Sequence, residues 1–144
     1  MLLLLVILGV CFLFLPKSEE IRIRVIANSD DTLDIKYKEE VVYYLKSEIL
    51  RDKKLTDEYF KTNYLLIEKE LNQKYTDIKV SYEYHNFDEK TYNGSVLIKG
   101  KYKTLVVRIG KSLGSNWWSS ICDGVIEKES DEKIKYEWYF LKGE

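Results

Sequence analysis

Hydrophobic residues in this chain recur with a period of two, then of three to four, and then of two again, and this order restricts the folds that are possible. Ile21, Ile23 and Val25 alternate with arginines, which is typical of a strand with one buried face. Residues 28–31 are polar and able to cap a helix start. Two amphipathic helices are expected next, with apolar faces formed first by Leu33, Tyr37, Val41, Leu45 and Ile49, and then by Phe60, Tyr64, Ile67 and Leu71.

The second half of the chain is predicted to be mainly strands. Asn93-Gly94 is a tight-turn signal, and apolar groups on both faces of residues 104–109 indicate a central strand. Trp117 and Trp118 are expected in a loop, followed by a charged connection at residues 127–133. The order predicts an α+β fold with two helices packed on one face of a mainly antiparallel sheet. Its later strands are expected at residues 78–85, 96–98, 104–109 and 134–141.

The first fifteen residues contain no charged side chain, and Pro16 and Lys17 end this apolar run. The run is short for a transmembrane helix, which needs roughly 20 apolar residues, and suits the core of a signal peptide. No basic residue precedes it and no Ala-x-Ala follows it, which favours an anchor that is not removed. We therefore expect a signal peptide or membrane anchor at residues 1–17, with membrane contact through residues 1–15, and a single extracytoplasmic domain at residues 18–144.

Several function classes are disfavoured by composition. Lys and Arg number 23 against 24 Asp and Glu, so no strong positive field attracts nucleic acid. His85 is the only histidine and is expected to face solvent at a strand end, while Cys122 is expected to fill apolar space. No phosphate-binding glycine loop or His/Cys cluster is present in the sequence, so we expect neither an enzyme nor a bound metal or cofactor.

Two stretches differ from ordinary helix and strand sequence. Residues 21–30 are a basic strand that leads into a polar cap, and residues 108–118 are a strand that leads through a Gly-rich loop to two tryptophans. Neighbouring side chains diverge, so we expect one tryptophan ring to be partly exposed as a binding hot spot. The two stretches are predicted to form one partner-binding patch, made of Arg24, Asn28, Ser29, Asp30, Gly114, Asn116, Trp117 and Trp118.

A purely structural interpretation of the same residues stays open at this point. Arg22 and Arg24 would then be a solvated strand face, Asn28 and Asp30 would cap the helix, and both tryptophan rings would be buried.

These stretches resemble the stage II sporulation protein R family of endospore-forming bacteria. Residues 21–30 match the family stretch Ile-Arg-x-Arg-Val-Ile-Ala-Asn-Ser-Asp throughout. The resemblance extends to about Leu141. It also includes Asp34, Lys38, Tyr92-Asn93-Gly94, Gly100-Lys101-Tyr102 and Asn116-Trp117-Trp118.

The resemblance implies a protein that is made in the forespore and acts outside the cytoplasm. Such a protein would be secreted, or anchored in the forespore membrane facing the intermembrane space. There it would activate its partner, a membrane-embedded aspartic protease of sporulation that processes the sigma-E precursor, so the catalytic residues would belong to the partner. The oligomeric state stays open.

The chain departs from the family pattern at two places. The family usually has a cysteine directly after the tryptophan pair and a second one later, whereas this chain has Ser119 there and Cys122 beyond it. A disulfide across that loop is therefore not expected, and Ile35 replaces a common glutamine. The alternative function is a cell-wall-associated glycan-binding module, in which Trp117 and Trp118 would form a stacking platform.

Overall fold

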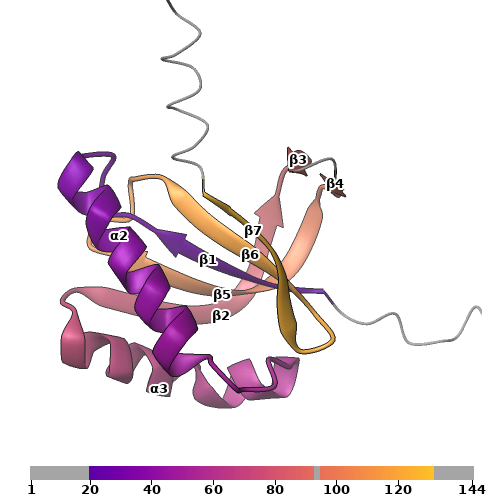
Figure 1. The fold of residues 1–144 in the computed structure, drawn as a ribbon, viewed down its shortest axis with the longest axis horizontal. Coiled ribbons are helices and arrows are strands. Elements are labelled where there is room, and N and C mark those ends of the chain that lie inside the picture. Colours follow the sequence, from indigo (N-terminus) through magenta and orange to yellow (C-terminus); the bar gives the residue numbers. More distant parts are fainter. Residues whose placement is uncertain (1–19, 93–94, 132–144) are drawn as a thin grey trace, which may run out of the picture.

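The computed structural model describes residues 20–92 and 95–131 (Figure 1). The predicted leader at residues 1–17 and the predicted last strand at 134–141 lie outside these ranges. None of the described helices is both long and apolar enough to cross a membrane.

Five strands form a mixed sheet in the order β2-β5-β1-β6-β7. Three of its four pairings are antiparallel, and the exception is the parallel pair of β1 and β5. The predicted mainly antiparallel sheet is therefore confirmed, with a parallel pair at its centre. The strands are β1 (Ile21–Ile26), β2 (Ile78–Phe87), β5 (Gly100–Ile109), β6 (Asn116–Cys122) and β7 (Val125–Asp131).

A separate hairpin follows β2 where the sequence predicted a tight turn. It consists of β3 (Lys90–Tyr92) and β4 (Ser95–Leu97), which are antiparallel and pair Tyr92 with Ser95. Residues 93–94, where the turn was predicted, lie outside the described ranges.

Two helices pack on the same face of the sheet (Figure 1). Helix α2 (Thr32–Tyr44) continues into a π-helical turn, η1 (Leu45–Ile49), and α3 (Asp57–Lys74) begins after its cap Thr56, whose Oγ1 accepts a hydrogen bond from the Tyr59 amide. Leu33, which the pattern assigned to the buried face of α2, is 81% exposed, because the buried stripe of this helix runs through Lys38, Val41 and Val42 instead.

The main core lies between the helices and alternate residues of the strands. The other face of the sheet, which we call the open face, carries a smaller cluster of Phe87, Leu97 and Trp118. The main core includes Ile21, Ile23, Val25, Leu105, Val107 and Ile109 of the strands and Phe60, Ile67 and Leu71 of α3.

Two segments expected to be irregular are strands. Trp117 and Trp118 belong to β6, opposite Val25 and Arg24 of β1, and residues assigned to a charged connection form β7. β7 lies at the edge of the sheet and is largely polar on both faces, so it lacks the apolar alternation by which a half-buried strand is recognised.

Candidate docking site

The two sequence motifs lie side by side, as predicted. β1 is placed between β5 and β6, so the loop that joins those two strands passes the end of β1. The Lys111 amide donates to Asn28 Oδ1 at 2.8 Å, and the Ser115 amide donates to Asp30 Oδ1 at 2.7 Å. We call residues 28–31 and 111–115 together the cap–loop junction.

The polar side chains of residues 28–31 connect the helix to other parts of the chain and do not cap it in the expected way. Asp31 occupies the N-cap position without a side-chain capping hydrogen bond. Asn28 Nδ2 and Ser29 Oγ instead donate to Asp34 Oδ2 at 2.8 and 2.6 Å. The hydrogen bonds from Ser29 and then Asn28 lower the pKa of Asp34, which keeps its carboxylate charged.

Two glycines allow the backbones to approach closely at this junction. A Cβ atom on Gly114 would lie 2.2 Å from the Ser29 carbonyl oxygen. Gly110 has a φ of 53°, and a Cβ atom there would lie 2.3 Å from Asn28 Oδ1. Gly114, which was predicted as part of a binding patch, is thus required by packing inside the protein.

Removing the Asp30 carboxylate is expected to destabilise the protein more than removing that of its neighbour. Asp30→Ala leaves the buried Ser115 amide without its acceptor, so the free energy of unfolding should fall by about 1–2 kcal/mol. The matched control Asp31→Ala removes no capping bond and should change it by less than about 0.5 kcal/mol. Urea denaturation measures both, and equal effects would contradict the assigned hydrogen bond.

The expectation that one tryptophan ring would be exposed is wrong. Trp117 is 5% exposed and Trp118 is 1% exposed. Consecutive residues of a strand do point to opposite sides, but both sides of β6 are covered. Trp117 joins the core under the helices, and Trp118 joins the cluster on the open face. Neither ring therefore presents a stacking face to a ligand.

Arg22 is buried, so it is not part of a solvated strand face. It is 1% exposed, and its guanidinium carbon lies 3.7 Å from the ring centroid of Tyr102 and 4.5 Å from that of Phe87. Its Nε donates to Glu20 Oε1 at 3.1 Å, whereas its Nη2 has no hydrogen-bond partner among the described residues. The aromatic faces stabilise this charge in place of water.

A polar cluster lies beside Arg22 on the open face and contains Arg24, Glu83, His85 and Arg108. His85 Nδ1 is 3.3 Å from Arg24 Nη1, and His85 Nε2 is 3.1 Å from Glu83 Oε1. Arg108 Nη1 also donates to Ser81 Oγ at 2.7 Å. His85 is thus half-buried among charged groups, contrary to the expectation of a solvent-facing strand end.

The pKa of His85 is expected to lie below 6.5 in the folded protein. Burial lowers this pKa most, the Arg24 charge lowers it further, and Glu83 opposes the shift. The unfolded chain then binds the proton more tightly, so stability should be constant above pH 6.5 and fall as the pH drops from there toward the folded pKa.

Proton NMR titration of the imidazole measures the pKa, and denaturation at several pH values measures the stability. His85→Gln should remove this part of the pH dependence. A folded-state pKa above 6.5, or an unchanged dependence in the variant, would contradict the assignment.

A buried lysine was not identified from the residue pattern as a functional group. Lys38 is 0% exposed, and its Nζ donates to Asp131 Oδ1 at 2.8 Å and to Ser115 Oγ at 3.3 Å. It joins α2 to β7 and to the cap–loop junction. The sequence feature that could have indicated a buried lysine is the position of Lys38, one turn before Val41 and Val42 on an otherwise apolar stripe.

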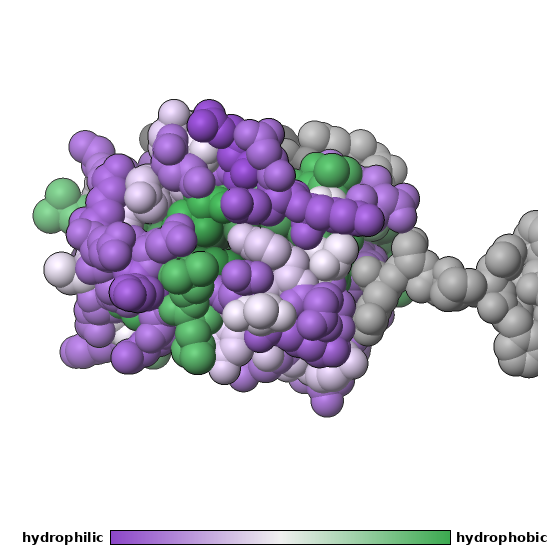
Figure 2. All heavy atoms as spheres, turned by 90° about the horizontal axis from the view of Figure 1, so that it is seen from below, coloured by the Kyte–Doolittle hydropathy of each residue, from purple (hydrophilic) through white to green (hydrophobic). Residues whose placement is uncertain are grey.

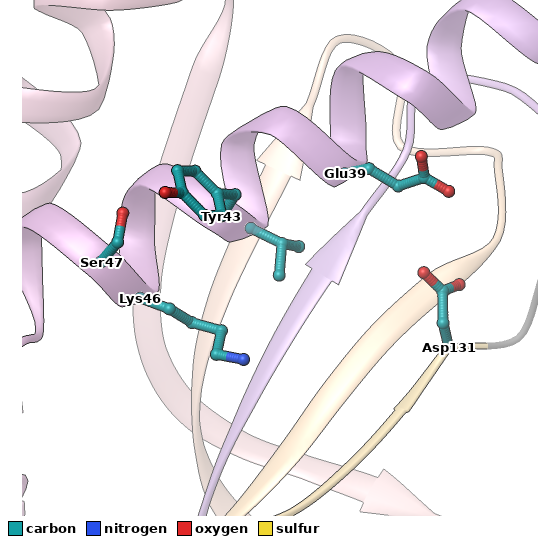
Figure 3. Close-up of a pocket in the computed structure, with 6 residues that line it drawn as sticks. Glu39, Tyr43, Lys46, Ser47 and Asp131 are labelled. Atoms are coloured by element: carbon teal, nitrogen blue, oxygen red, sulfur yellow. The ribbon is translucent and has the colours of Figure 1, made fainter.

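A cavity of about 430 Å³ lies between this helix and β7 (Figure 3). Lys46 extends from η1 toward the strands and forms an ion pair with Glu129. The lining mixes apolar, acidic and basic groups, so its charge selects no ligand class. Its residues are Glu39, Val42, Tyr43, Lys46, Ser47 and Asp131.

Metal and thiol chemistry have little support in the part of the chain that the structure describes. Its His, Cys, Asp and Glu side chains form no group of three that could hold a metal ion. Cys122 is a free thiol, and its pKa is raised by burial and then by Glu127, which disfavours the reactive thiolate.

The chain matches a known protein family. Residues 17–123 match the family model described as Stage II sporulation protein R (spore_II_R). No curated protein and no solved structure matches the chain significantly.

Proposed function

Because the chain belongs to the stage II sporulation protein R family, we propose that it is an exported signal of endospore formation that activates a membrane-embedded aspartic protease, which processes the sigma-E precursor. The observation that carries this proposal is the family match, which extends from before β1 to the end of β6. The match includes the whole cap–loop junction and both arginines of β1.

A role in binding is favoured over catalysis by the state of the titratable groups. A general base needs a nitrogen or oxygen that is free to accept a proton from substrate. Both ring nitrogens of His85 already contact protein groups, Arg24 on one side and Glu83 on the other. Together with the raised thiol pKa of Cys122, this supports a protein that acts through its surface.

The proposed location is the space between forespore and mother cell. The support is the uncharged run at residues 1–15, which suits an export signal or anchor. The folded domain would then meet a protease whose extracytoplasmic part faces the same space.

Complementation tests the proposed function directly. The full-length chain is expressed in the forespore of an endospore-forming bacterium that lacks its own family member, and conversion of the sigma-E precursor is followed by immunoblot. We expect conversion with the full chain and none with a chain that starts at Ser18 and stays in the cytoplasm. Absence of conversion despite a folded, exported chain would refute the proposal.

The glycan-binding alternative has lost its main support. It required an exposed aromatic platform, and both rings of the tryptophan pair are buried. Sedimentation with purified peptidoglycan should therefore leave the domain in solution.

A further inference from the structure

β2 is an edge strand, and its hydrogen-bonding pattern can be followed residue by residue. It pairs with β5 in unbroken register from Ile78 opposite Ile109 to Phe87 opposite Gly100. Just before β2, the Asp77 carbonyl accepts a hydrogen bond from the Gly110 amide, so odd-numbered residues exchange backbone bonds with β5. The N–H and C=O groups of even-numbered residues therefore point outward, away from the sheet.

Side chains of helix α3 satisfy these outward groups at the beginning of the strand. Asn72 accepts from the Ile78 amide at 3.1 Å and donates to the Ile78 carbonyl at 2.8 Å. Glu68 Oε2 accepts from the Val80 amide at 2.7 Å. Side chains of α3 thus take the place of a neighbouring strand along the first few residues of β2.

The later part of this edge has no such cover. Among the described residues, no hydrogen bond reaches the outward backbone groups of Tyr84 and Asn86. Leu65 and Lys61 lie on the same helical stripe as Glu68 and Asn72, one and two turns further toward the N-terminus of α3, so this stripe continues along β2 beyond Val80.

The uncovered edge has an apolar surface beside it. Leu65 is 61% exposed and Tyr84 is 55% exposed. α3 is the lowest helix in Figure 1, and the view from below in Figure 2 shows a band of hydrophobic atoms between hydrophilic ones.

We propose that the outer edge of β2 at Tyr84–Asn86, together with Leu65, binds an extended segment of another protein as an added strand. The inference rests on the proposed function, since it names the surface through which the signal would meet its partner. Only another extended backbone places donors and acceptors at the spacing of the outward groups. Main-chain bonds would supply affinity, and Leu65 and Tyr84 would select an apolar side chain.

Charge around the edge defines the partner segment further. On the open face, Arg24 and Arg108 both contact His85, next to Tyr84, and these two cations outnumber Glu83, the carboxylate of the same cluster. Side chains of an added strand alternate between the two faces, so the segment should carry acidic residues on the open face and apolar ones beneath Leu65.

A second copy of the chain does not suit this edge. Paired strands lie about 4.8 Å apart. In a symmetric antiparallel pair, any extension of the pairing toward Ile78 would bring the α3 helices of both copies, which lie against that part of the edge, toward each other, and packed helices need about 8–10 Å between axes.

The opposite edge, β7, is a poorer template. It has seven residues against ten in β2, and its pairing with β6 shifts register between Ser120 and Ile121. Such an irregularity twists an edge and disfavours strand addition.

The test uses the full chain and a synthetic peptide of alternating Glu and Val, with a Lys and Val peptide as the charge control. Amide hydrogen exchange should show rapid exchange of Tyr84 and Asn86 in the free protein and protection on adding the Glu–Val peptide. Binding of the Lys–Val peptide should be weaker. Absence of protection at these two amides, or equal binding of both peptides, would overturn the proposal.

A matched pair of variants separates backbone pairing from side-chain loss. Tyr84→Pro removes an outward N–H that β5 does not use, whereas Tyr84→Thr keeps it. Tyr84→Pro should bind the peptide about tenfold more weakly than Tyr84→Thr, as expected for loss of about 1.4 kcal/mol. Leu65→Glu against Leu65→Lys provides a second pair that leaves the strand intact, and the glutamate variant should bind more weakly. Equal affinities within both pairs would refute strand addition.

The processing assay separates this inference from the proposed function. If the unaltered chain supports sigma-E precursor conversion and folded Tyr84→Pro supports it as well as Tyr84→Thr, the edge is not the docking surface although the function stands. If the unaltered chain supports no conversion, the proposed function fails whatever the peptide measurements show. A concentration-dependent dimer in sedimentation that Tyr84→Pro abolishes would assign the edge to a second copy and overturn the proposal.

Discussion

Asp131→Ala is expected to lower the free energy of unfolding by about 3–5 kcal/mol, because it leaves the Lys38 ammonium buried without its carboxylate. The Lys38 side chain is 0% exposed and cannot turn to water, whereas the Asp131 side chain is 20% exposed. Ser115 Oγ is the other group that Nζ contacts, and a neutral hydroxyl does not balance the charge.

Replacing the lysine instead of the aspartate should lower the free energy of unfolding much less. Lys38→Met fills similar space without a charge and leaves a carboxylate that water reaches, so a loss below about 1.5 kcal/mol is expected. In the double variant the missing carboxylate should no longer matter, and its stability should approach that of Lys38→Met. Denaturant unfolding of the unaltered chain, the two single variants and the double variant gives the coupling free energy between Lys38 and Asp131. Equal losses for the two single variants would contradict the expectation that Lys38 depends more on its partner than Asp131 does.

Trp118→Ala should lower the free energy of unfolding by about 3–5 kcal/mol, although this residue was first expected in a binding loop. The ring is 1% exposed and packs against Phe87, with centroids 6.4 Å apart. It also forms part of the aromatic surroundings of Arg22, whose guanidinium carbon lies 5.5 Å from its centroid. Truncation would therefore open a cavity beside a buried charge.

Trp118→Phe is the control, because it keeps an aromatic face and should lose less than half as much stability. Trp117→Ala should also be strongly destabilising, since that ring packs in the core on the other face. Thermal unfolding measures all three variants. A folded Trp118→Ala protein with unchanged stability would mean that this ring lies at the surface. Any signalling defect of the alanine variants must accordingly be compared at equal amounts of folded protein.

Much of the architecture follows from local pattern. β1, α3 and β2 have the periodicity of elements with one buried face, and the hairpin of β3 and β4 lies where the sequence has a turn signal. The contact between the two motifs was also predictable, since both flank strands of one sheet. The order of the strands within the sheet was not predictable from the sequence, because it depends on the pairing of β1 with two strands that are far away in the chain.

The candidate site was harder to predict for a specific physical reason. An arginine or lysine in a strand or helix normally indicates a solvated face. Arg22 and Lys38 are buried because aromatic rings and a carboxylate from distant segments surround them, and no local pattern encodes such surroundings. The burial of both tryptophan rings was not predicted for the same reason. Trp118 is buried because the hairpin and the neighbouring strands contribute Leu97 and Phe87 to a second small core on the open face.

The central position of β1 has a consequence for the order in which the chain can fold. β1 is made early, yet its two neighbours are residues 104–108 and 116–121, so it stays without strand partners until most of the domain has been synthesised. Such long sequence separations slow folding. The sheet would therefore stay incomplete until β6 has been made, which suits the proposed export of the chain, because a polypeptide is threaded through a membrane before it folds.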